Sequence, residues 1–60
     1  MARYNVYFKS ENASPYDSNR NSYTVDASNE QEAIANWEKT SYVTNGSYRN
    51  KIVGVEKISG

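Results

Sequence analysis

The fold follows from one stretch of the chain, residues 28–39, which reads Ser28-Asn29-Glu30-Gln31-Glu32-Ala33-Ile34-Ala35-Asn36-Trp37-Glu38-Lys39. Its apolar residues recur at the spacing of a single helix face, which predicts an amphipathic helix. Ser28 and Gln31 have the spacing of a capping box, and Asn29 and Glu32 repeat that spacing one residue later. We therefore predict a helix over residues 28–39 and leave both capping registers open.

Two segments before this stretch alternate between apolar and polar residues, which is typical of strands that bury one face. The first is residues 3–9, and the second, residues 22–27, repeats the alternation with a less apolar face. Between them, residues 10–21 are rich in Ser, Asn and Asp, which favour local turns over a strand ladder. The sequence therefore predicts two strands joined by a long polar loop.

The segment after the helix also contains a strand pattern. Within residues 51–58, Val53 and Val55 alternate with Ile52, Gly54 and Glu56. Gly54 would leave room for an aromatic neighbour or mark a bulge. Residues 40–50 contain Asn45-Gly46, a strong type I′ turn signal. We predict a third principal strand over residues 51–58, preceded by either a small β-hairpin or an irregular loop.

The rules for connecting strands and helices fix how these elements pack. The first two strands pair antiparallel, and a right-handed crossover through the helix places the last strand beside the first. The predicted fold is a small α+β domain, β-β-α-β, in which residues 1–60 form a single domain. It has a three-stranded antiparallel sheet of order 2-1-3, with one helix packed on one face and the other face open. The predicted core consists of Tyr4, Val6, Phe8, Tyr23, Val25, Ile34, Trp37 and Val53.

The composition makes several classes of function improbable. The chain has 60 residues, with no Cys and no His, so it lacks the usual general base, the strongest nucleophile and the ligands of most zinc sites. We expect no enzyme activity, no metal and no cofactor. No apolar run is long enough to span a membrane, and the absence of Cys suits a reducing compartment. We therefore expect a cytoplasmic protein that does not act at a membrane.

The net charge is zero, but the charges are unevenly distributed. Residues 26–38 carry four acidic side chains and no basic one, whereas residues 39–60 carry four basic side chains and one acidic one. In the predicted sheet, basic side chains of the first and last strands meet on the open face, together with Tyr rings of the kind that dominate protein interfaces. The predicted partner-binding residues are Arg3, Tyr7, Lys9, Tyr48, Arg49, Lys51 and Lys57.

Three alternatives to this protein-binding face remain. Basic side chains beside Tyr rings also suit nucleic acid, although an isoelectric point near 6.1 is low for a nucleic-acid-binding domain. The acidic exterior of the helix, with Glu32, Asn36 and Glu38, would instead suit a basic partner. An ordinary solvated sheet face has the same composition, because charged side chains also discourage edge pairing.

The order of the elements resembles a known group of proteins. Over residues 22–58, an alternating strand, the run Ala27–Ile34 that enters the helix and a Val-rich basic last strand resemble the small phage-encoded inhibitors of bacterial RNA polymerase. Small anti-CRISPR proteins are similar in size and pattern. The resemblance implies a non-enzymatic inhibitor that blocks a bacterial host complex in the host cytoplasm. It also implies that Lys57 contacts the partner, while Val55 departs from the family pattern, which has a basic residue there.

Overall fold

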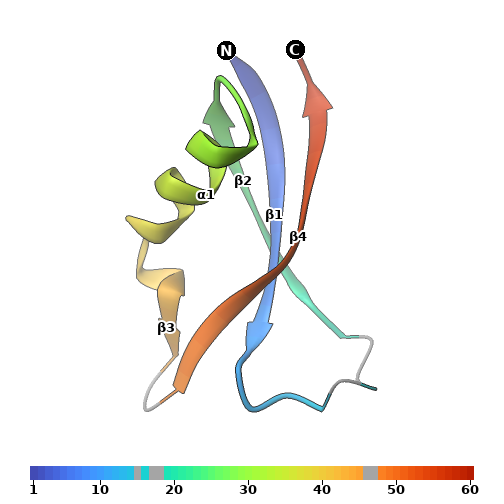
Figure 1. The fold of residues 1–60 in the computed structure, drawn as a ribbon, viewed down its shortest axis with the longest axis vertical. Helices are drawn as coiled ribbons and strands as arrows, with labels where there is room; N and C mark the ends of the chain where they lie inside the picture. The colour runs from blue at the N-terminus through green and yellow to red at the C-terminus, as the bar shows by residue number, and fades with distance from the viewer. Residues whose placement is uncertain (15, 17–18, 46–47) are drawn as a thin grey trace.

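β1 is the central strand of the sheet and lies between β2 and β4 (Figure 1). The computed structural model describes residues 1–14, 16, 19–45 and 48–60. The elements are β1 (Ala2–Ser10), β2 (Asn21–Ala27), α1 (Glu30–Glu38), the 3-10 helix η1 (Ser41–Val43), β3 (Thr44–Asn45) and β4 (Tyr48–Ser59).

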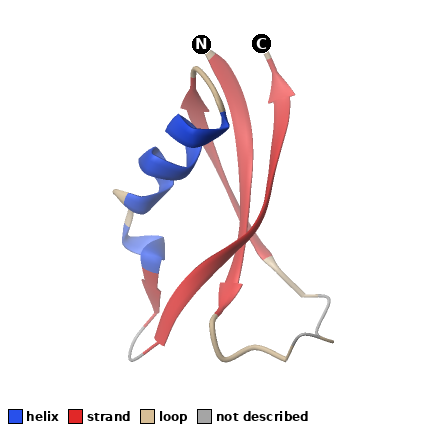
Figure 2. Cartoon of the chain, viewed as in Figure 1, coloured by secondary structure: helices blue, strands red, loops and turns tan. Residues whose placement is uncertain are grey.

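The sheet has the order β2-β1-β4-β3, and each neighbouring pair is antiparallel. α1 packs on one face of this sheet, as Figure 2 shows. The predicted α+β fold is confirmed, because the three principal strands have the expected order and one helix covers one face. β3 adds a short pair at the start of β4, with Thr44 opposite Arg49 and Asn45 opposite Tyr48. Residues 40–50 therefore contain a small strand pair, while Gly46 of the predicted turn lies outside the described residues.

α1 begins at Glu30, two residues after the predicted start, because Asn29 is its N-cap. Asn29 Oδ1 accepts a hydrogen bond from the Glu32 backbone N–H at 2.8 Å. The Glu32 carboxylate accepts one in return from the Ser28 backbone N–H at 3.2 Å. Of the two capping registers, the structure therefore has the later one, and each bond satisfies a backbone donor at the start of the helix.

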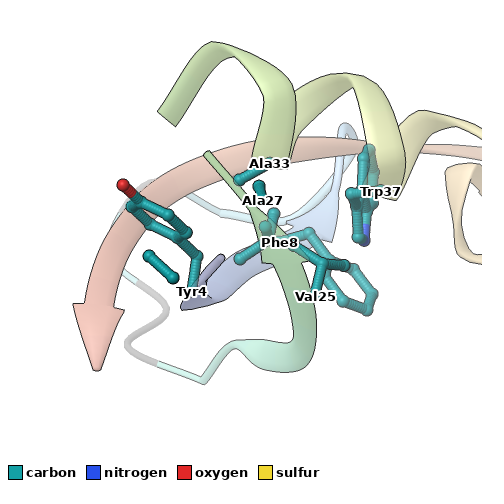
Figure 3. Packing of buried hydrophobic residues seen from close by; sticks show 8 residues of the cluster. Tyr4, Phe8, Val25, Ala27, Ala33 and Trp37 are labelled. Atoms are coloured by element: carbon teal, nitrogen blue, oxygen red, sulfur yellow. The ribbon is translucent and has the colours of Figure 1, made fainter. Parts of the chain in front are cut away.

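The core lies between α1 and the sheet, and Figure 3 shows its packing. Its buried residues are Ala2, Tyr4, Val6, Phe8, Val25, Ala27, Ala33 and Trp37. Ala27 of β2 and Ala33 of α1 are completely buried, and residues this small allow the helix to approach the sheet closely. The core positions predicted for Tyr4, Val6, Phe8, Val25 and Trp37 are confirmed.

Three predicted core positions differ in the structure. Ile34 is only half-buried, and Tyr23 and Val53 are 37% and 41% exposed. Tyr23 lies in the first half of β2, which is exposed, whereas α1 shields the second half of that strand around Val25 and Ala27. The prediction for Tyr23 was wrong because alternation along a strand does not show how far a helix extends over it.

Val53 is exposed because the pairing of β1 with β4 skips it. Tyr7 is opposite Gly54 and Phe8 is opposite Ile52, so β4 has one extra residue at this point. Such a bulge reverses the alternation of side chains along the strand, and Ile52 rather than Val53 packs against the core. Gly54 lies beneath Tyr7, because a Cβ added to it would sit 3.6 Å from Tyr7 Cδ2. Both roles predicted for Gly54, room for an aromatic ring and proximity to a bulge, are present.

Candidate partner-binding surface

The open face of the sheet is the face opposite α1, and β1 supplies its centre. Arg3, Asn5, Tyr7 and Lys9 alternate with the buried residues of β1 and therefore point to this face. Residues paired across antiparallel strands lie on the same face, so the register extends the open face onto both neighbouring strands. Those paired residues are Ser22, Thr24 and Asp26 of β2 and Lys51, Gly54, Glu56 and Ser59 of β4.

Cross-strand contacts hold most of this face in place. Arg3 Nε lies 3.3 Å from Asp26 Oδ1, and Thr24 Oγ1 donates to Asn5 Oδ1 at 2.7 Å. These contacts bind β1 to β2 through exposed polar side chains. Because the groups are solvated, each pair stabilises the fold by only about 0.2–1 kcal/mol.

Tyr7 lies at the centre of the face and is fixed by two groups. Its hydroxyl donates to Glu56 Oε1 at 3.0 Å, and the Arg20 guanidinium carbon lies 3.8 Å from the centre of its ring. The second contact is a cation–π interaction with the last residue before β2. The ring therefore lies close to Gly54 and is covered by Arg20, an arrangement that leaves less of it for stacking on a base.

The end of the face near Ser10 is basic. Lys9 and Lys51 are directly opposite each other in the pairing of β1 with β4, and like charges at such positions destabilise a sheet. Lys9 Nζ donates to the Ser14 carbonyl at 3.5 Å. Arg49 lies two residues before Lys51, and its carbonyl accepts a hydrogen bond from the Glu11 backbone N–H at 2.9 Å. We call Lys9, Arg49 and Lys51 the basic end.

The structure separates the remaining predicted residues from the basic end. Lys57 is opposite Tyr4, a core residue, so the register places Lys57 on the helix side of the sheet. Tyr48 precedes Arg49 and therefore points to the opposite side of β4. The predicted single patch is thus split. The Val53 bulge places Lys57 and Lys51 on opposite sides of the sheet, and alternation places Tyr48 on the opposite side from Arg49.

The alternative acidic surface is mostly occupied by structural contacts. Glu32 takes part in helix capping, and Asn36 Nδ2 donates to the Asp26 carbonyl at 2.9 Å. Glu38 remains exposed at the end of α1. Two of the three residues predicted for this surface therefore stabilise the helix and its contact with β2.

An aromatic cluster that the sequence patterns did not predict lies on the helix side. Ring centres are 5.2 Å apart for Phe8 and Trp37, 5.7 Å for Phe8 and Tyr42, and 4.8 Å for Tyr23 and Tyr42. A hollow of 370 Å³ opens beside these rings; its lining residues are Phe8, Asn21, Ser22, Tyr42 and Thr44. Tyr42 comes from η1, inside the segment that had no regular pattern, so its contact with Phe8 depends on the tertiary fold.

Comparison with known proteins finds no matching family model, and no curated protein or solved structure with a significant match. Within the described parts of the chain, no group of three acidic residues is placed to hold a metal ion. No described helix has the length and apolar character needed to cross a membrane.

Proposed function

We propose that the chain is a non-enzymatic binding protein that attaches to an acidic surface of a bacterial protein complex and blocks it. In this proposal it is the product of a phage or mobile element, and its target is RNA polymerase or a defence complex such as a CRISPR effector. The family likeness in the sequence supports these two targets. The protein acts in the bacterial cytoplasm, where such complexes are found.

The observation that carries the proposal is the pair of cations Arg49 and Lys51 on the open face, with Lys9 directly opposite Lys51. A sheet gains stability when opposite charges face each other and loses it when like charges do. Among the described residues, no acidic side chain forms an ion pair with Arg49 or Lys51. An acidic partner would neutralise Arg49 and Lys51, and complementary charge also speeds the encounter of two proteins.

A protein partner fits this face better than nucleic acid. Asp26 and Glu56 share the open face with the basic end, and both would repel a phosphate backbone that ran along the sheet. Tyr7 is held by Glu56 and covered by Arg20, so its ring is poorly placed to stack on bases. Nucleic-acid-binding domains usually carry a strong positive charge, whereas the net charge of this chain is zero.

The test is capture of the target from bacterial lysate with tagged protein, followed by affinity measurements on the purified target. The double variant Arg49→Glu with Lys51→Glu is expected to weaken binding at least tenfold, a difference of about 1.4 kcal/mol. Lys57→Glu is the control, because it reverses one positive charge on the other side of the sheet. Equal loss in the control and the double variant would contradict the proposal.

The same experiment tests the nucleic-acid alternative. Binding to protein should survive nuclease treatment of the lysate and weaken moderately as salt rises. Capture of nucleic acid alone, released steeply with salt as counterion release requires, would overturn the protein-partner proposal.

A further inference from the structure

Among the described residues, β1 is the only strand that pairs with β2, so no strand covers the outer edge of β2 (Figure 1). The direction of the β2 backbone groups follows from β1. The Glu11 backbone N–H donates a hydrogen bond to the Arg49 carbonyl of β4. Glu11 and Arg49 are the next two residues along the strands after the pair Ser10 and Asn50. Backbone groups of successive residues point to opposite sides of a strand, so odd-numbered residues of β1 bond to β4 and even-numbered ones bond to β2.

The partners of those even-numbered residues are Asn21, Tyr23, Val25 and Ala27. The backbone groups of Ser22, Thr24 and Asp26 must then point away from β1. An independent contact agrees: Asn36 Nδ2 donates to the Asp26 carbonyl at 2.9 Å from the helix. The Asp26 carbonyl is therefore covered at this edge, whereas the N–H and C=O groups of Ser22 and Thr24 have no hydrogen-bond partner among the described residues.

The free part of β2 lacks the features that usually protect an edge strand. Its residues Asn21–Ala27 pair with β1 without a bulge and include no Lys and no Pro. β4 is different, because its pairing with β1 is interrupted by bulges at Val53 and Ile58, and Lys57 lies next to the second bulge. Bulges and Lys residues discourage strand addition, so β2 is the better template for a further strand.

We propose that a second copy of the chain pairs with this edge, β2 against β2, antiparallel about a two-fold axis at Tyr23. In this register Ser22 exchanges two backbone hydrogen bonds with Thr24 of the partner subunit, and Thr24 does the same with the partner subunit's Ser22. Their outward-pointing groups meet as antiparallel pairing requires. The same contact occurs twice, as in any isologous dimer.

Charge and apolar surface in this register favour a second copy. Arg20 and Asp26 both lie on the open face, because Arg20 covers Tyr7 and Asp26 bridges to Arg3. In the proposed pairing, Arg20 is opposite the partner subunit's Asp26, so two pairs of opposite charges flank the four hydrogen bonds. Tyr23, which is 37% exposed, is opposite the partner's Tyr23, an aromatic cross-strand pair. Because Asn36 covers the rest of the edge, the interface is short and the dimer depends on concentration.

The first experiment is sedimentation equilibrium of the wild-type protein and two variants at concentrations up to 1 mM. Thr24→Pro removes an N–H that points away from β1, so it blocks the edge without breaking the β1–β2 ladder. Thr24→Ala keeps that N–H and loses the same side-chain bond to Asn5, which makes it the matched control. The dimer dissociation constant is expected to rise at least tenfold more in Thr24→Pro than in Thr24→Ala. A wild-type protein that is monomeric throughout this range, or two variants that dimerise equally, would overturn the proposal.

The second experiment exchanges charges between subunits. Arg20→Glu and Asp26→Lys each place like charges together in their own homodimers, so each alone should dimerise less than the wild-type protein. Mixed together, they restore both opposite-charge pairs, and the heterodimer should form in preference to either homodimer. Circular dichroism confirms that each variant is folded before mixing. A mixture that shows no heterodimer excludes the proposed register.

Discussion

Phe8 of β1 lies opposite Ile52 of β4, and Val53 is the residue that the pairing skips. Ile52→Thr and Val53→Thr should therefore have different effects, although both keep a β-branched side chain. Ile52→Thr places a hydroxyl against the core and should lower the free energy of unfolding by about 2 kcal/mol. Val53→Thr changes an exposed position and should stay within about 0.5 kcal/mol. Urea denaturation measures both, and a larger loss for Val53→Thr would mean that the bulge is elsewhere.

Trp37 should be the most sensitive position in the helix, because it is 2% exposed and packs against Phe8. Trp37→Ala should cost about 3–5 kcal/mol, enough to unfold a domain of this size as followed by circular dichroism. Trp37→Phe keeps the aromatic packing and removes the indole Nε1, a buried donor with no hydrogen-bond partner among the described residues. It should cost less than half as much. A cooperative melt for Trp37→Ala near that of the wild-type protein would contradict the role of Trp37 in the core.

Asn29 should matter more than Ser28 for the stability of α1, because Asn29 Oδ1 caps the helix. Asn29→Ala should lower the free energy of unfolding by about 1 kcal/mol, while Asn29→Asp keeps an acceptor and should retain the cap. Ser28→Ala should cost less, because Glu32 accepts chiefly from the Ser28 backbone N–H, which the substitution preserves. Thermal melts of the three variants would reveal the opposite order if Ser28 were the cap.

Lys51→Glu should increase stability while it weakens partner binding. The substitution replaces a like-charged pair with Lys9 by an opposite-charged one, which is worth about 0.2–1 kcal/mol at directly opposed positions. Lys57→Glu, opposite Tyr4, lacks this gain and serves as the control. Chemical denaturation at low salt measures the difference, and the gain should shrink in high salt because screening weakens exposed charge pairs. Destabilisation by Lys51→Glu would show that Lys9 and Lys51 do not repel each other in the folded protein.

Alternation and capping signals predicted the principal elements, because β1, β2 and α1 each have a uniform pattern over their length. The predictions failed where tertiary contacts decide. The Val53 bulge moved Ile52 into the core and placed Lys51 and Lys57 on opposite sides of the sheet, and its only local sign was Gly54. Asn36 was predicted to lie on a binding surface, but its side chain donates a hydrogen bond to the Asp26 carbonyl. This bond depends on how the helix crosses β2.

The candidate surface was predictable only in part for the same reason. Arg3, Tyr7 and Lys9 lie on one regular strand, so their shared face follows from period-two alternation. Whether Lys51 and Lys57 share this face depends on how many of the β4 residues between the two lysines pair with β1, and the pairing skips Val53. Tyr42 had no periodic neighbours, and its place between Phe8 and Tyr23 comes from the fold as a whole.

The central position of β1 has a consequence for synthesis on the ribosome. β1 is made first, but one of its two neighbours, β4, consists of residues 48–59. Until those residues leave the exit tunnel, β1 lacks one of its two neighbours, and the two-stranded β1–β2 ribbon depends on packing against α1 for its stability. The complete sheet therefore forms only after this region has been translated, and its last step closes the long loop between Ser10 of β1 and Asn50 of β4.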